Sequence, residues 1–306
     1  MKMKTAILIA TTMVITTLSL SSCGNKSAEA EQAIDPANAP WIVDRFDDIK
    51  VLRYEVPGFE NLPLNQKLLV YYLAQASKCG RDILFDQNFK YNLAIRRTLE
   101  QIYTNYDGDR EAAEFKAMEK YLKKVWFANG IHHHYSGDKF IPEFSQEYFI
   151  QLVKGVPADK LPTEFGSVEE LLATLTPIIF DPTLYAVKIN QKEGEDLLQT
   201  SAMNYYEGLT QAEAEAFYNS ITDANDPTPI SYGLNSKLVK ENGKAVEKVY
   251  KVGGMYGPAI EQIVFWLEKA AGVADATQRP IIEKLIEYYR TGDLEAFDAF
   301  NILWAQ

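Results

Sequence analysis

All three histidines of the 306-residue chain lie in one run, His132-His133-His134, which is followed by Tyr135. Histidine is the side chain most used to bind catalytic zinc and to transfer protons near neutral pH. Three consecutive residues cannot converge on one ion, because neighbouring side chains point about 100° apart on a helix and to opposite faces on a strand. The run therefore predicts a polar loop or the exit of a helix, and the lining of a cleft is the second interpretation.

Two other places carry side chains that could do chemistry. Asp107 and Asp109 flank Gly108, and a pair of carboxylates is what glycosidases use. A turn that caps the helix expected from Arg110 is the interpretation we favour. Cys79 ends a helical pattern with no base partner in view, which predicts a small buried apolar side chain and not a nucleophile.

The N-terminus has the pattern of a bacterial lipoprotein signal peptide. Lys2 and Lys4 precede an apolar stretch, residues 6–20, that is too short to span a membrane comfortably. Small residues then lead to Cys23 and resemble a lipobox, in which the thiol is acylated and the chain is cut just before the cysteine; ordinary secretory cleavage is the alternative. Acylation would anchor the protein in the cell envelope, as a periplasmic or outer-membrane lipoprotein. The expected division of the chain is a signal peptide (1–22), a flexible polar tether (23–40) and a folded part (41–306).

Composition limits the class of partner. The formal charge is −11, and removal of Lys2 and Lys4 with the signal peptide makes it more negative still. This balance argues against nucleic acid as a partner. Apolar residues make up 47% of the chain and aromatic residues 12%, which suits one large domain or two that pack intimately.

The hydrophobic pattern predicts a mostly helical α+β protein. Expected helices cover residues 65–77, 88–105, 110–128, 259–271, 279–289 and 294–304, and further helices start at Ser167 and at Thr210, the latter ending at 221. Expected strands cover residues 49–56 and 185–189 and a hairpin, 238–240 with 246–250, around Asn242-Gly243. In the third helix, Phe115, Met118, Tyr121, Leu122 and Val125 share one face and are expected in the core.

Four segments together resemble the N-terminal half of bacterial dipeptidyl peptidase III. They are residues 45–59 (RFDDIKVLRYEVPGF), 125–142 (from VWFANG to KFIP), 256–260 (YGPAI) and 297–304 (FDAFNILW). The likeness extends over about residues 41–306 in order and without large gaps. No single segment is a catalytic motif, so its specificity comes from the series.

The resemblance implies a zinc exopeptidase that releases dipeptides from the N-terminus of oligopeptides and has two lobes around a wide cleft. This chain would be most of one lobe, incomplete at its C-terminus, with part of a small β-barrel packed against helices. In the family an H-E-x-x-G-H helix and a later glutamate of the C-terminal half hold the zinc, whereas this sequence has no His-Glu pair. The E-[ST]-Y-x-D-P stretch expected soon after Trp304 is absent too. We therefore expect the chain to bind no zinc and to be inactive without the missing C-terminal lobe.

One site element is implied by the resemblance. In the family the loop that matches residues 130–140 lies at the cleft and presents an aromatic side chain to the N-terminal side chains of the substrate. The matching residue is Tyr135, with His134 beside it, so both are expected to contact an oligopeptide substrate. With the resemblance, the lining of a cleft becomes the favoured interpretation of the histidine run, and a solvent loop becomes the second.

A hypothesis from another class is a non-catalytic, lipid-anchored lipoprotein that binds peptides or sugars through its aromatic side chains. The 18 tyrosines and 4 tryptophans fit such a role. Aromatic residues at helical spacing are more typical of a core than of a ligand platform. A following H-E-x-x-G-H motif in the coding frame would favour the peptidase.

Overall fold

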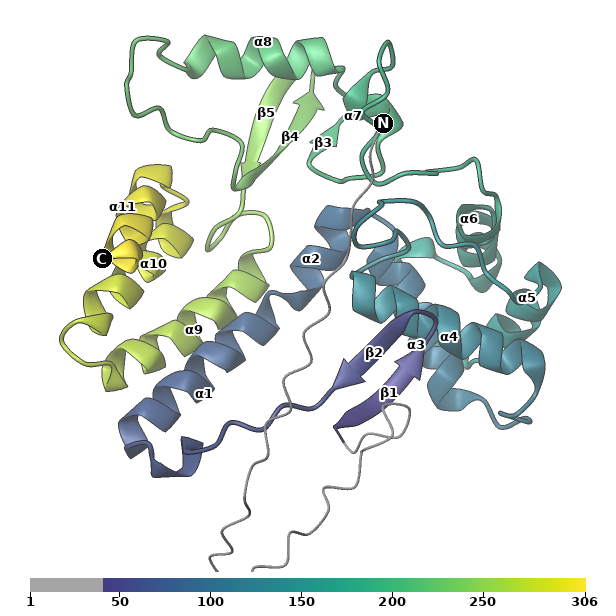
Figure 1. The fold of residues 1–306 in the computed structure, drawn as a ribbon. Helices are drawn as coiled ribbons and strands as arrows, with labels where there is room; N and C mark the ends of the chain where they lie inside the picture. Colours follow the sequence, from purple (N-terminus) through teal and green to yellow (C-terminus); the bar gives the residue numbers. More distant parts are fainter. Residues whose placement is uncertain (1–40) are drawn as a thin grey trace, which may run out of the picture.

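The structure is a computed structural model that describes residues 41–306 (Figure 1). The expected signal peptide, tether and acylated Cys23 lie outside the described residues. The helices are α1 (Leu64–Cys79), α2 (Arg81–Asn88), α3 (Asn92–Asn105), α4 (Ala113–Ala128), α5 (Gln146–Gly155), α6 (Val168–Phe180), α7 (Leu197–Thr200), α8 (Gln211–Ile221), α9 (Gly257–Val273), α10 (Gln278–Thr291) and α11 (Leu294–Ala305). The strands are β1 (Ile42–Phe46), β2 (Ile49–Leu52), β3 (Tyr206–Glu207), β4 (Ser236–Glu241) and β5 (Lys244–Val249). None of these helices is long and apolar enough to cross a membrane.

A first core lies among α2, α3, α4, α5 and α6. The predicted apolar face of α4 is buried in it: Phe115, Met118, Tyr121, Leu122 and Val125 are all buried. Helix α4 ends at Asn129, whose backbone is left-handed (φ 54°), as the Asn-Gly pair predicts. This helix end directly precedes the histidine run.

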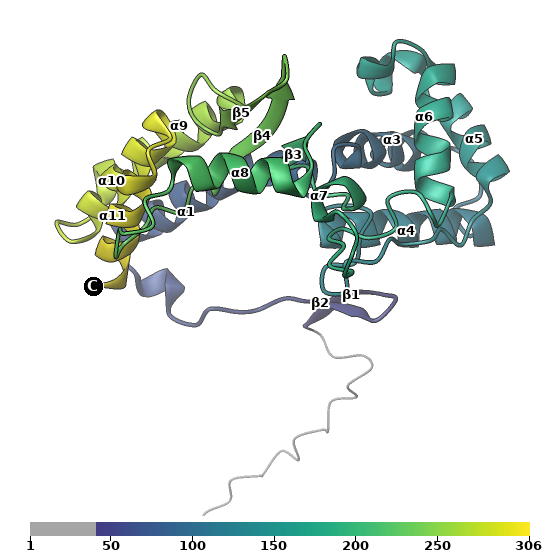
Figure 2. The same ribbon diagram turned by 90° about the horizontal axis from the view of Figure 1, so that it is seen from above.

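A second core is built from helices that are far apart in the sequence. Helix α1 lies along α9, α10 packs on α9, and α11 packs on α10. Cys79, at the end of α1, is half-buried against this core and its thiol donates a hydrogen bond to the Gln75 carbonyl (3.3 Å). Viewed from above, this helical group and the α3–α6 group lie at opposite ends of the molecule, with the sheet between them (Figure 2).

The sheet between the two groups has the order β3-β4-β5. Strands β4 and β5 form the predicted hairpin, with Asn242 (φ 50°) and Gly243 (φ 78°) at its turn. Helix α8 packs on the sheet and begins with the predicted capping box, in which Thr210 and Glu213 bond to each other's backbone amides. Within residues 41–306 this sheet is open, so the expected barrel is not present as a closed one. Three short strands cannot meet edge to edge, because even a small barrel requires about five.

Other expectations about the elements were wrong in part. The helix expected from residue 88 begins at Asn92 instead, because the backbone of Phe89 is extended (φ −170°, ψ 133°) and separates α2 from α3. The side-chain amide of the buried Asn92 donates to the Phe85 carbonyl (3.0 Å) across this break. The strand expected over 185–189 is absent: Tyr185 has a left-handed backbone (φ 50°), and only Val187 forms a bridge, to Asp138. Strand β1 and helix α5 had not been expected. Strand β2 is shorter than the run 49–56.

Candidate functional site

The histidine run lies in a tight loop, residues 131–140, that leaves the first core and returns to it. The Phe140 amide donates to the Ile131 carbonyl (2.8 Å) at its base, and the His133 amide donates to the Asp138 carbonyl (2.8 Å) further out. Gly130 precedes the loop with φ 147°, and a Cβ there would lie 2.1 Å from the side-chain nitrogen of Asn92. Only glycine fits at this position. The loop is therefore fixed to the core at its base.

The three histidines have separate environments. His132 is 2% exposed, and its Nε2 lies 2.8 Å from the Tyr185 carbonyl, to which it must donate because a carbonyl only accepts. Its Nδ1 is buried with no hydrogen-bond partner among the described residues. Burial is the main cause that lowers the pKa of His132 to about 4. This imidazole is therefore neutral at physiological pH and belongs to the core.

His133 and His134 lie outside the core. The Nδ1 of His133 accepts from the backbone amides of Tyr135 and Ser136, both at 3.2 Å, and so shapes the tip of the loop. The ring of His134 stacks on that of His133, with centroids 4.4 Å apart. The same ring lies 4.4 Å from Tyr135 and meets Phe127 edge-on at 4.8 Å.

Phe127, His134 and Tyr135 form what we call the aromatic platform. Tyr135 is 89% exposed at the tip of the loop, and Phe127, at the end of α4, is 47% exposed. Phe46 of β1 continues the row beyond Phe127, with centroids 6.4 Å apart. Such a surface can pack against an apolar or ring-shaped group of a ligand. The rings of His134 and Tyr135 are in contact, and Phe127 and Phe46 extend the row; substrate contact by His134 and Tyr135 stays a prediction.

The β1–β2 hairpin is held beside the platform by ion pairs with α4 (Figure 1). Lys123 Nζ lies 2.9 Å from Asp44, and Lys124 Nζ lies 2.5 Å from Asp47. These ammonium groups hold the pKa of each carboxyl below its usual range. The ammonium of Lys124 also lies 4.6 Å from the centre of the Phe140 ring, at the base of the loop.

The imidazoles do not fit a zinc site. His132 Nε2 is bonded to a carbonyl inside the core, and His133 Nδ1 is taken by two backbone amides. Over residues 41–306, no group of three or more His, Cys, Asp or Glu side chains is placed to hold a metal ion. The described side chains at the platform therefore do not converge as the three or more protein ligands that a zinc site needs.

The carboxylate pair of residues 107–109 forms a turn. Asp109 Oδ1 accepts from the Glu111 amide (2.9 Å), and α4 begins only at Ala113. The arrangement is an Asx turn. The turn favoured by the sequence is present, but it does not cap a helix from Arg110, because the N-cap of α4 is Ala112 and that end has no side-chain capping bond.

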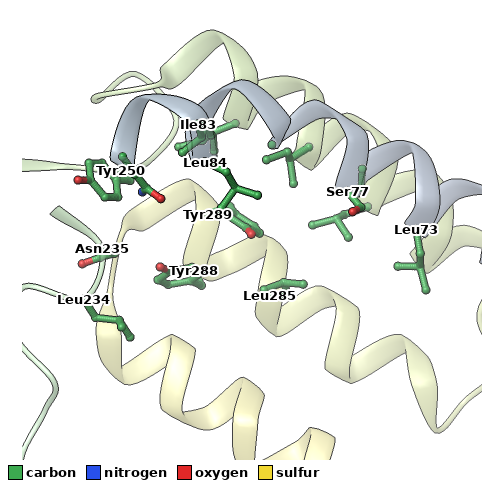
Figure 3. A pocket seen from close by; sticks show the side chains of 16 residues that line it. Leu73, Ser77, Ile83, Leu84, Leu234, Asn235, Tyr250, Leu285, Tyr288 and Tyr289 are labelled. Carbon is green, nitrogen blue, oxygen red and sulfur yellow. The ribbon is translucent and has the colours of Figure 1, made fainter. Parts of the chain in front are cut away.

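A separate groove of about 520 Å³ opens in the second core (Figure 3). Leucines of α1 and α10, with Tyr288 and Tyr289 of α10, face Leu234 and Asn235 of the loop before β4 across it. None of the described residues that line the groove is charged. The groove can receive apolar groups.

The sequence did not point to Phe127, Phe46 or the hairpin as parts of the site. In the sequence, Phe127 is one apolar residue among several in a predicted helix. Its exposure depends on the place where α4 ends. Residues 42–46 (IVDRF) do not alternate apolar and polar side chains, so no period-2 pattern in the sequence marks β1. The contact between Phe46 and Phe127 is long-range and has no local pattern.

Comparison with known proteins finds similar chains among solved structures. No protein-family model and no curated protein sequence matches the chain. Dipeptidyl peptidase III from Caldithrix abyssi is 16% identical with a TM-score of 0.46, and dipeptidyl-peptidase III from Corallococcus sp. strain EGB is 17% identical with a TM-score of 0.47. Each match covers 82% of this chain and 34% of the solved chain, so this chain spans about a third of their length. The likeness to dipeptidyl peptidase III expected from the sequence is thus found again among solved structures.

Proposed function

We propose that this chain is the N-terminal portion of a zinc-dependent dipeptidyl peptidase III and releases dipeptides from oligopeptides only together with a C-terminal lobe. The four sequence segments shared with that family support the proposal. Zinc, with the water that it activates when bound, would come with the other lobe, because this chain has no His-Glu pair. The part played by this chain is to bind and orient the peptide.

The observation that carries the proposal is the exposure of Tyr135 on a loop that is fixed to the core. An 89% exposed aromatic ring contributes little to the core, yet here two backbone amides and the His134 ring define its position. A rigid, exposed aromatic side chain loses little conformational freedom on binding. We infer that Tyr135 packs against an apolar side chain near the N-terminus of the substrate and that His134 supports the ring from behind.

The test joins residues 1–306, in one continuous chain, to the C-terminal lobe of a bacterial dipeptidyl peptidase III. The joined chain should release dipeptides from a fluorogenic substrate in a zinc-dependent manner, and the 1–306 protein should not. Tyr135→Ala in the joined chain should lower kcat/KM about tenfold, the effect of one lost aromatic contact of roughly 1–2 kcal/mol. Tyr54→Ala is the matched control, because Tyr54 is 82% exposed and follows β2 at the open end of the hairpin, opposite the end at which Phe46 pairs with Ile49.

Two results would contradict the proposal. Robust release of dipeptides by the 1–306 protein would show that the catalytic groups lie within this chain. Unfolding of Tyr135→Ala, in place of a kinetic defect, would show that Tyr135 is a packing residue.

A second candidate function is binding without turnover, by a lipoprotein that holds peptides or sugars. The platform favours it, because stacked aromatic rings can retain an apolar group or a sugar ring without any catalytic partner. Micromolar binding of a tetrapeptide to the 1–306 protein, with no activity in the joined chain, would favour this candidate over the peptidase.

A further inference from the structure

A buried ammonium group lies under the loop that carries Tyr135. Lys139 is 7% exposed, and its Nζ donates to the carbonyls of Ile178 (3.0 Å), Leu184 (2.6 Å) and Asp181. An ammonium has three N–H donors, so these three carbonyls use all of them. The group is fully satisfied although it is almost removed from water.

The three carbonyls belong to the end of α6 and the turn that follows it. The last carbonyls of a helix lack partners within it and form the negative end of its dipole. Lys139 supplies a positive charge and hydrogen bonds at this point, from a different part of the chain. The ammonium therefore ties the loop to the end of α6.

Backbone and side-chain hydrogen bonds then join the loop to residues 185–188. They are His132 Nε2 to the Tyr185 carbonyl (2.8 Å), the Lys139 amide to the Ala186 carbonyl (2.9 Å) and the Lys188 amide to the Gly137 carbonyl (2.7 Å). His132 and Lys139 are themselves paired across the loop. One turn of the loop thus has two buried polar side chains at its base and the exposed Tyr135 at its tip.

We propose that Lys139 is a positioning residue for Tyr135: its ammonium fixes the loop against the end of α6, so that the Tyr135 ring is presented in one place. The inference rests on the proposed function of Tyr135 and adds a residue to it. Lys139 does not itself contact the ligand, because its ammonium is enclosed by protein carbonyls and is not available as a nucleophile or a base.

Lys139→Met is the central test, since methionine has a similar length and no donors. Amide hydrogen exchange should become at least about tenfold faster at residues 131–140 and at Lys188, while the amides of α4 stay protected. Lys116→Met is the matched control: Lys116 lies on α4, is paired with Glu111 at the surface and does not touch the loop. Unchanged exchange in Lys139→Met would overturn the inference.

Binding of the tetrapeptide Phe-Phe-Ala-Ala to the 1–306 protein tests the link to Tyr135. Lys139→Met and Tyr135→Ala should each raise the Kd of the peptide about tenfold. The double variant should raise it no further, because both changes remove the same contact, the one between the Tyr135 ring and the peptide. Additive losses would overturn the inference, since Lys139 would then act by another route. If the joined chain releases no dipeptide, the proposed function fails, while the exchange measurement still decides whether Lys139 holds the loop.

Lys139→Arg replaces Lys139→Met in the exchange measurement if Lys139→Met does not fold. Arginine keeps the charge, but its planar guanidinium cannot direct three donors at carbonyls that surround a single point. Faster exchange confined to residues 131–140 and Lys188 is expected. Faster exchange spread evenly over α2 to α6 would overturn the inference, because Lys139 would then be a general core residue.

Discussion

The stability of the first core should depend on pH through His132. This imidazole is buried, donates through Nε2 to the Tyr185 carbonyl and has no partner for Nδ1. Protonation of Nδ1 would add a third positive charge to those of Lys139 and Lys188, and the carboxylate of Asp138 would offset it in part. We therefore expect acid to destabilise the folded protein at this residue.

The size and the sign of this change in the free energy of unfolding follow from the pKa of His132 in the folded and in the unfolded protein. The pKa of His132 is about 4 in the folded protein and about 6.5 in the unfolded chain. Above pH 6.5 both states are neutral, and between pH 6.5 and pH 4 only the unfolded state gains the proton, so stability falls as the pH falls. The loss is about 2 kcal/mol at pH 5 and approaches about 3 kcal/mol below pH 4.

Urea denaturation at pH 7 and pH 5, followed by circular dichroism, measures this loss. His132→Gln keeps a donor for the Tyr185 carbonyl and cannot titrate, so the pH-dependent part should disappear in it. With a slope of about 3 kcal/mol per molar urea, the wild-type midpoint should move about 0.7 M further than that of the variant. The paired carboxylates Asp44 and Asp47 have lowered pKa values and therefore titrate below this window.

His134→Gln is the matched control, because it removes a titrating imidazole from the same loop outside the core. It should keep most of the wild-type pH dependence. Equal pH dependence in wild type and His132→Gln would refute the reasoning, and the neutral, buried state assigned to His132 would then be wrong.

Three further predictions concern the backbone, a helix cap and the anchor. Gly130→Ala should cost about 3 kcal/mol in the free energy of unfolding, because its Cβ would meet Asn92 and its φ is positive; Gly155→Ala, in open space, should be nearly neutral in the same thermal melts. Thr210→Ala should lose the capping box of α8 and cost about 1 kcal/mol in urea denaturation, and an unchanged midpoint would contradict the role of the cap. Intact mass of membrane-extracted protein should show an acylated Cys23 as the first residue, and an unmodified N-terminus elsewhere would remove the lipoprotein proposal.

Elements that are specified by a few adjacent residues could be predicted from the sequence. The capping box at Thr210 and the Asn242-Gly243 turn are determined by the geometry of three or four residues, and both were predicted correctly. Asp293 likewise caps α11, accepting from the Glu295 amide. In each case the hydrogen bonds that define the element lie within the pattern that was read.

Features that depend on distant contacts could not be predicted. The start of α3 depends on the bonds that the buried Asn92 makes with Phe85 and the end of α4, and no local pattern contains them. The different environments of His132 and His134 depend on Tyr185, more than fifty residues away along the chain. A run of three identical side chains gave no means to tell the buried histidine from the two half-buried ones.

The pairing of α1 with α9 has a consequence for biosynthesis. All of α2 to α8 is translated between these two partners, and the first core, apart from Ala202, is complete in sequence once α6 has left the ribosome. Leu69 and Ala76 of α1 therefore stay uncovered until α9 is made. The pairing of the two helices then costs the conformational entropy of closing the long chain segment between them. A nascent chain halted before Gly257 would therefore hold a native first core next to an unpaired α1, which is the kind of apolar surface that chaperones bind.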